Sequence, residues 1–162
     1  MTTDANVEPR SLYDQDYQIW LDDTVAHLQS RNFDALDWEN LIEEIESLGR
    51  SDKRSIKSYL RLLCEHFFKL CYWEAERDRC FRGWSIEIAN FRIRISTILD
   101  DSPSLKRYLV DNFLAEYHNA RRLFLKASAL DNATIPEQPW FTLEQTLDHD
   151  WLPWQPAPPA KH

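Results

Sequence analysis

The stretch SIKSYLRLLCEHFFKLCYW, residues 55–73, decides the fold because no other segment is apolar around so much of its circumference. On a helix with about 3.6 residues per turn, its apolar side chains and His66 fill an arc of roughly 200°, about twice the width that a surface helix needs. The remaining arc carries polar side chains, but also Phe68 and Tyr72. We therefore expect a central helix over about residues 51–73 that several neighbouring elements cover.

Composition points to an all-α protein. The 162 residues are within the usual range for one domain and can bury a sizeable core. Gly occurs only at positions 49 and 83, which excludes glycine-rich phosphate loops and disfavours turn-dense β folds. The chain also holds 7 Trp, 6 Tyr and 8 Phe, enough for a bundle core with aromatic residues to spare for a binding face.

Helical spacing of apolar residues predicts four further helices, at about residues 13–31, 37–48, 84–99 and 103–130. Asn32 and Gly49 are expected to end the first two in left-handed turns, and residues 74–83 break the apolar period and read as a connecting loop. Asp34 or Asp37 can cap the second helix. In the fifth, Ser102 can cap while Pro103 takes the first helical position. The helix at 84–99 carries two apolar faces, which predicts two contacts.

The C-terminal part is rich in Pro and Trp, so only residues 142–147 can be helical, with Thr142 as their cap. The rest of that part is expected to lie as an extended strap over the bundle and to fray after Trp154. The sequence thus predicts a single-domain bundle of about five main helices, mostly antiparallel because the connections are short. We expect a flexible arm over 1–12, the helical domain over 13–154 and a flexible Pro-rich tail over 155–162.

The net charge of −8 disfavours general affinity for nucleic acid, whose backbone attracts clustered Lys and Arg. The charge is uneven: residues 1–50 hold 3 Lys or Arg and 12 Asp or Glu (net −9), residues 51–107 hold 12 and 8 (net +4), and residues 108–162 hold 4 and 7 (net −3). A basic run opens the central helix, at Lys53, Arg54, Lys57 and Arg61. We expect this run to pair within the chain with the acidic segment Glu39 to Glu46.

Three cysteines are too few, and odd in number, for a disulfide framework. Cys64 and Cys71 lie seven residues apart on one helix, about 10.5 Å along its axis, which exceeds the ~7 Å limit for a bridge. Reduced thiols favour a cytoplasmic location. The first ten residues have no apolar signal core, and no run approaches the ~18 apolar residues of a membrane span, so no membrane partner is expected.

Short matching segments occur in a fixed order along most of the chain. They are Tyr13, Asp16 and Trp20; Leu36, Asp37, Asn40, Leu41, Ile42, Glu44, Ile45, Leu48 and Gly49; His66 and Lys69; Trp84, Ile88 and Arg92; Ser102 to Leu105; Tyr117, Ala120 and Arg121; Pro139 and Trp140; and Leu152 and Pro153. This ordered set, over about residues 13–153, resembles the mostly cyanobacterial family catalogued as domain of unknown function 29. The resemblance implies an all-helical fold and carries no activity or catalytic residues.

His66 is the residue that most directly separates function classes, because an imidazole within an apolar arc must find partners or lose stability. One interpretation makes it a general base or ligand in a polar pocket. The other, which we weigh more heavily, is a structural His bonded to a carboxylate or tyrosine of another helix. The candidate pocket residues are His66, Lys69, Trp84, Arg92, Tyr117 and Arg121. No cofactor is predicted, and no metal, because neither a CxxC pair nor an HExxH helix is present.

Two groups of residues are candidates for a protein interface. Arg61, Phe68 and Tyr72 combine the residue types that dominate interface hot spots, although cover by the Pro/Trp strap explains them equally well. Ile86, Ala89 and Ile93 form the smaller apolar face of the helix at 84–99, open to another helix or another subunit. Our hypothesis is a cytoplasmic protein that binds a protein partner and self-associates as a homo-oligomer. The alternative is a small-molecule binder or enzyme with the pocket around His66.

Overall fold

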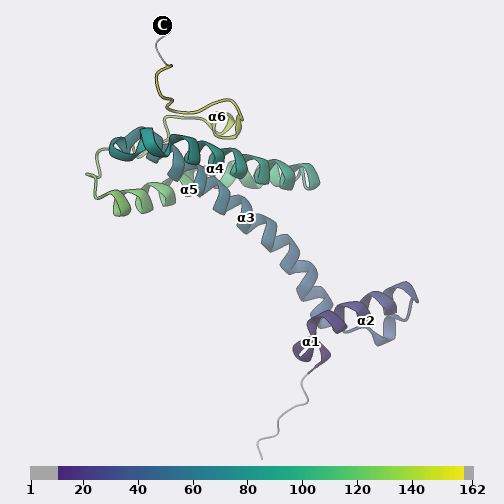
Figure 1. Cartoon of the computed structure of the whole chain (residues 1–162). Helices are drawn as coiled ribbons and strands as arrows, with labels where there is room; N and C mark the ends of the chain where they lie inside the picture. Colours follow the sequence, from purple (N-terminus) through teal and green to yellow (C-terminus); the bar gives the residue numbers. More distant parts are fainter. Residues whose placement is uncertain (1–10, 159–162) are drawn as a thin grey trace, which may run out of the picture. The chain divides into compact units, whose positions relative to one another are not determined.

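The computed structural model describes residues 11–158, and this part of the chain is all-helical, as the sequence predicts. Its elements in chain order are α1 (Leu12–Gln15), α2 (Tyr17–Gln29), the short 3-10 helix η1 (Phe33–Ala35), α3 (Trp38–Tyr72), α4 (Glu74–Asp101), α5 (Leu105–Ser128) and α6 (Leu143–Leu147) (Figure 1). The described residues contain no β-strand. The arm predicted over 1–12 lies outside this range except for Ser11 and Leu12, which cap and begin α1.

Where the sequence predicted one domain, the chain divides into two compact units, one up to Arg50 and one from Ser51 onward. Helix α3 contributes residues to both units. In the second unit, Figure 1 shows α4 and α5 running in opposite directions, as the short connection between them requires. Residues 155–158 are exposed and have no regular structure, and the rest of the predicted tail lies outside the described residues.

The turn predicted at Gly49 is wrong, because Gly49 lies inside the 35-residue helix α3. No glycine has a positive φ. A glycine in a helix interior costs only about 1 kcal/mol, which neighbouring interactions can offset. Arg50 supplies such interactions, since its guanidinium pairs with Glu43 at 3.1 Å and with Glu46 at 3.3 Å along the same helix.

The loop predicted over residues 74–83 is also wrong, because α4 already begins at Glu74. Trp73 alone leaves the helical conformation, with φ −93° and ψ 64°, and its carbonyl accepts hydrogen bonds from the amides of Glu76 and Arg77. The two acidic residues of the first turn suit the positive end of the helix dipole. The break in apolar period therefore marks an exposed turn of helix and no loop.

The ends of the other helices follow local capping chemistry, with small shifts from the prediction. Asp37 caps α3 by accepting a hydrogen bond from the amide of Asn40 at 3.3 Å, and Thr142 caps α6 with Gln145 in a capping box. The left-handed residue after α2 is Arg31, with φ 58°, in place of Asn32.

Two predicted helices have different limits in the structure. The helix predicted over 13–31 is divided at Asp16, whose carboxylate caps α2 by accepting from the amide of Ile19 at 3.1 Å. Helix α5 begins at Leu105, two residues after the predicted Pro103.

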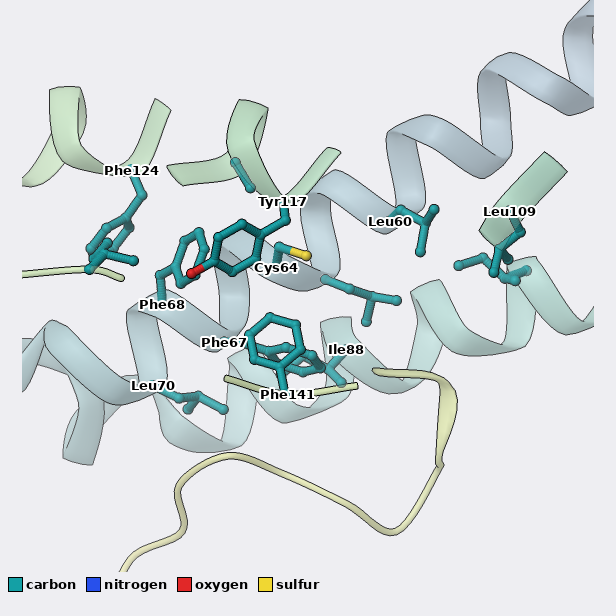
Figure 2. Packing of buried hydrophobic residues seen from close by; sticks show 14 of the residues in the cluster. Leu60, Cys64, Phe67, Phe68, Leu70, Ile88, Leu109, Tyr117, Phe124 and Phe141 are labelled. Atoms are coloured by element: carbon teal, nitrogen blue, oxygen red, sulfur yellow. The ribbon is translucent and has the colours of Figure 1, made fainter. Parts of the chain in front are cut away.

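The core of the second unit forms where α3, α4, α5 and the C-terminal strap meet. Its fully buried side chains include Ile56, Leu60, Leu63, Cys64, Phe67, Phe68 and Leu70 on α3, Ile88 and Ile95 on α4, and Leu109, Tyr117 and Ala120 on α5. Figure 2 shows Phe141 of the strap beside Phe67, and their ring centroids are 5.1 Å apart. The strap, residues 131–154, therefore completes the core that the wide apolar arc of α3 requires.

No helix of the described residues has both the length and the apolar character needed to cross a membrane.

Candidate protein-binding surface

His66 is buried and bonded at both ring nitrogens. Nδ1 donates to the Leu62 carbonyl at 2.8 Å, and Nε2 lies 2.5 Å from a carboxylate oxygen of Glu87 on α4. Because a carbonyl can only accept, Nδ1 carries the proton of its hydrogen bond. The ring also packs edge-on against Phe91 at 5.3 Å. This is the arrangement of a structural histidine bonded to a carboxylate of another helix.

Arg92 is buried and holds the strap. Its Nε donates to the Thr146 carbonyl at 2.9 Å, and one terminal nitrogen donates to the carbonyls of Gln145 at 3.2 Å and Trp151 at 2.9 Å. Its guanidinium also lies over the Phe67 ring, 5.6 Å from the centroid. Burial lowers the pKa of Arg92 to about 10, so the group remains charged at neutral pH.

Tyr117 and Arg121 on α5 hold the beginning of the same strap. The Tyr117 hydroxyl donates to the Pro136 carbonyl at 2.7 Å, and burial raises the pKa of this phenol. Arg121 donates from Nε to the Ile135 carbonyl at 2.9 Å and from a terminal nitrogen to the Asn132 carbonyl at 2.5 Å. Both side chains donate to backbone carbonyls, so they can hold the Pro-rich strap in place although this part of it has no regular secondary structure.

The six candidate pocket residues are not joined around one site. Lys69 lies over the Trp84 ring, 5.9 Å from its centroid, and Tyr117 and Arg121 share the strap. No hydrogen bond, ion pair or ring contact links His66 to another member of the set within the described residues. These residues thus do not form one pocket, and His66, Arg92, Tyr117 and Arg121 are hydrogen-bonded within the protein.

Arg121 also lines a hollow of about 900 Å³ between α5 and residues 132–138. His118, Arg122 and Lys126 of α5 line it as well, and the strap contributes Glu137. Sequence alone does not single out His118, Arg122 and Lys126, because nothing in it shows that residues 132–138 lie opposite them.

The candidate interface on the central helix is closed. Phe68 is fully buried, with Trp140 of the strap 5.8 Å from its ring and Tyr117 at 5.3 Å. Tyr72 packs edge-on against Trp140 at 5.6 Å, and Arg61 lies 3.6 Å from Glu65 on its own helix. The prediction that Phe68 belongs to an exposed interface is therefore wrong. Trp140 of the strap packs against Phe68 and Tyr72 on this side of α3.

The second candidate interface is open. Ile86 and Ile93 on α4 are 54% and 53% exposed, and Ala89 between them is half-buried.

The basic run finds partners other than the expected ones. Lys57 lies 3.6 Å from the buried carboxylate of Glu116 on α5, and Lys53 lies over the Tyr108 ring at 5.6 Å. The expected pairing of these two lysines with Glu39 to Glu46 is corrected, because α5 presents a carboxylate and an aromatic ring beside them.

Neither Cys64 nor Cys71 has an activating environment. Cys64 is buried, and desolvation raises the pKa of its thiol; desolvation likewise raises the pKa of Cys71 to about 11. In the part of the chain that the structure describes, no group of three or more His, Cys, Asp and Glu side chains could hold a metal ion.

The first unit is held together by aromatic and polar contacts along one edge of α3. Tyr13 and Tyr17 donate their hydroxyls to the two carboxylate oxygens of Glu44, at 2.5 and 2.8 Å, and Trp20 donates its indole N–H to Asp37 at 3.3 Å. Hydrogen bonding to Glu44 raises the pKa of Tyr13 to about 12, and the same bonds lower the pKa of Glu44. Helix α2 thus contacts α3 at its acidic edge.

This contact leaves the apolar side of α3 uncovered. We call this side the α3 stripe, and it consists of Trp38, Leu41, Ile42, Ile45 and Leu48. Four of them are more than half exposed: Trp38 51%, Ile42 54%, Ile45 60% and Leu48 69%. The helical spacing of these five residues predicts the stripe from the sequence, but the spacing does not indicate what covers it. In the first unit only Trp20, Thr24 and Leu36 of the described residues are buried.

The family described as "Domain of unknown function DUF29" matches residues 12–152. The chain belongs to this family. The suspected resemblance is therefore confirmed. Neither a curated protein nor a solved structure is similar enough to match. The DUF29 match begins at α1 and ends in the strap, so it includes the α3 stripe as well as the residues that hold the strap.

Proposed function

We propose that this DUF29 protein works by binding other proteins, and that the α3 stripe is its principal binding surface. The observation that carries the proposal is four large apolar side chains, each more than half exposed, in register on one face of a helix. Isolated exposed apolar side chains are normal on protein surfaces, whereas a contiguous row of them marks a site of interaction.

The free energy available on this face is large. Removing a Leu or Ile side chain from water yields about 1.5–3 kcal/mol when burial is complete. The three aliphatic residues that are most exposed here, Ile42, Ile45 and Leu48, could therefore contribute several kcal/mol to a complex.

The condition of the polar residues supports binding over catalysis. A small-molecule binder or enzyme would present His66, Arg92 and Tyr117 with polar atoms free toward an open pocket. In the structure, His66 is bonded to Leu62 and Glu87, and the other two hold backbone carbonyls of the strap. These side chains serve the fold.

The proposal is tested by capture from native cytosol with three forms of the protein. These are the wild type, Ile45→Gln in the α3 stripe, and Val110→Gln on α5 as a control of nearly equal exposure. Proteins retained by the wild type and the control but lost from Ile45→Gln would support binding through the stripe. Identical sets of retained proteins from all three forms would contradict it.

Self-association is a second proposal, which the exposed pair Ile86 and Ile93 on α4 supports. A two-fold symmetric contact would use the same patch from both copies. Sedimentation velocity should then show a dimer or larger species that Ile93→Glu dissociates and Ile45→Gln leaves intact. A monomer at micromolar concentration would contradict the proposal.

We also propose a cytoplasmic location, which the three free cysteines support. Reduced, unpaired thiols are typical of that compartment. Cell fractionation that recovers the protein outside the cytosol would contradict it.

A further inference from the structure

We propose that the partner of the α3 stripe is an amphipathic helix whose apolar face is bordered by Lys and Arg. The inference rests on the proposed function and names the chemistry of the partner. It is carried by the arrangement of charge around the stripe.

The stripe is a continuous arc with a helical repeat. At about 100° per residue, its five members fall within an arc of about 120° centred on Ile45. Trp38, Leu41, Ile45 and Leu48 follow one another at intervals of three, four and three residues. These are the a and d intervals of a heptad seam, which another helix fills by inserting its side chains between those of the first.

Carboxylates border this arc on both sides. Asp37 and Glu44 lie about 80–100° from the centre on the edge that faces α2, and Glu39 and Glu46 lie about 100–120° away on the other edge. In helix pairs, the charges of the residues that flank the seam determine which partner helix is attracted and which is repelled. A partner with cationic flanks is attracted by these carboxylates, most strongly on the α2 edge because Arg50 already pairs with Glu46 on the other, and a partner with acidic flanks is repelled.

The carboxylates on the α2 edge remain charged although they are engaged. Hydrogen bonds from Tyr13 and Tyr17 lower the pKa of Glu44, and those from Asn40 lower the pKa of Asp37. Neutral donors position these groups without cancelling their charge. On the other edge, Glu46 pairs with Arg50, and Glu39 is exposed.

The same charge excludes two other occupants. A second copy of the stripe would place acidic edges against acidic edges, each from a segment of net charge −9 over residues 1–50. An anionic membrane surface would be repelled for the same reason. The stripe spans residues 38–48, about 15 Å of helix, so a partner segment of three to four turns would cover it.

The test uses three synthetic peptides of about two heptads with Leu at the a and d positions. They differ only in their flanking residues, which are Lys in the first, Gln in the second and Glu in the third. Fluorescence anisotropy measures the binding of each to the full-length protein. The variants are Ile45→Gln, Glu39→Gln and the control Val110→Gln on α5, which is also exposed, with circular dichroism confirming that each variant is folded.

We expect the Lys peptide to bind at least tenfold more tightly than the Glu peptide. Its affinity should fall about tenfold between about 0.1 M and 1 M salt, where the screening length decreases from about 10 Å to 3 Å. Ile45→Gln should weaken binding of the Lys peptide severalfold, Glu39→Gln should weaken it less, and Val110→Gln should leave it unchanged.

Three results would overturn the inference, and they separate it from the proposed function. Equal binding of all three peptides, lost in Ile45→Gln, would keep the stripe as a protein-binding surface and refute the cationic partner. Binding of the Lys peptide that Ile45→Gln does not weaken would show nonspecific charge attraction away from the stripe. A dimer that Ile45→Gln dissociates would place a second copy on the stripe.

Discussion

At the scale of single residues, the buried polar side chains form hydrogen bonds that join one element of the fold to another. His66 and Arg92 come from the buried faces of α3 and α4, where an unpaired polar atom would cost about 1–3 kcal/mol. Sequence alone could show that His66 lies in an apolar arc, and it left the choice between ligand and structural group open. The partner of His66, Glu87, lies 21 residues away in the sequence, so only the structure could identify it.

Replacement of His66 by Ala should therefore destabilise the protein. The change removes the donor to Leu62 and the partner of Glu87 and leaves a cavity, so we expect a loss of about 1–3 kcal/mol in the free energy of unfolding. The melting temperature should fall by several degrees, since about 1 kcal/mol shifts it by about 2–4 °C at this size. Glu87→Gln is the control and should cost less, because it keeps a hydrogen-bonding group on an exposed side chain. An unchanged or higher melting temperature for His66→Ala would indicate a functional histidine.

The Glu44 cluster predicts a dependence on pH. Because hydrogen bonds from Tyr13 and Tyr17 lower the pKa of Glu44 in the folded protein, its contribution to stability is present above the unfolded value of about 4.3. That contribution is lost as the pH falls through the lowered folded value. In Tyr13→Phe, the pKa of Glu44 should rise toward its ordinary value, and in Tyr17→Phe it should rise less. Carboxyl NMR titration measures both, and an unchanged pKa in Tyr13→Phe would contradict the assignment.

At the scale of elements, helix type and position could be read from the sequence, but helix length could not. Apolar periodicity located the segments that form α2, α3, α4 and α5, and Thr142 identified the start of α6. The two wrong helix limits lie where residues that usually end a helix are held in the helix by neighbouring side chains. Gly49 and the polar residues 74–83 both look like interruptions, yet side-chain pairs on exposed faces carry the helix through them. Apolar periodicity does not detect these pairs, because both partners are charged.

The continuity of α3 can be tested by adding a methyl group. Gly49 has helical backbone, and beyond its chain neighbours and the adjoining helix backbone no atom lies within 4 Å of the position that its Cβ would occupy. Gly49→Ala should therefore stabilise the protein by about 0.5–1 kcal/mol, because Ala loses less backbone entropy in a helix. Gly83→Ala in α4 is equally unobstructed and should behave alike. If Gly49 instead occupied the left-handed turn that the sequence predicted, Ala would destabilise the protein in chemical denaturation.

The strap predicts a local effect of Arg92. Arg92→Ala removes the donors to three strap carbonyls, at Thr146, Gln145 and Trp151, and two of those bonds are 2.9 Å long. We expect residues 142–154 to become sensitive to limited proteolysis while α3 to α5 stay resistant. Arg94→Ala is the matched control because Arg94 is exposed on the same helix. Equal cleavage of the two variants would show that apolar contacts alone hold the strap.

At the scale of the whole molecule, the two units differ in how much they bury. The second unit encloses a continuous core, whereas the first buries three of its described residues and leaves the α3 stripe open. Periodicity correctly located the stripe, but a sequence pattern does not state what covers an apolar face. That information depends on where α2 packs, and α2 is held at the acidic edge by Tyr13, Tyr17 and Trp20.

This difference predicts unequal protection from hydrogen exchange. Local opening is easiest where few apolar contacts are broken, so amides of α2 should exchange much faster than those of residues 56–70, which line the main core. Mass spectrometry of exchanged peptides measures both in one experiment. Binding of the Lys-flanked peptide should slow exchange in residues 38–48 and in α2, because a ligand stabilises the unit that it binds. Uniform protection along the chain would mean that the first unit opens only when the whole protein unfolds. That result would contradict the prediction that the first unit opens at a lower free energy than the second.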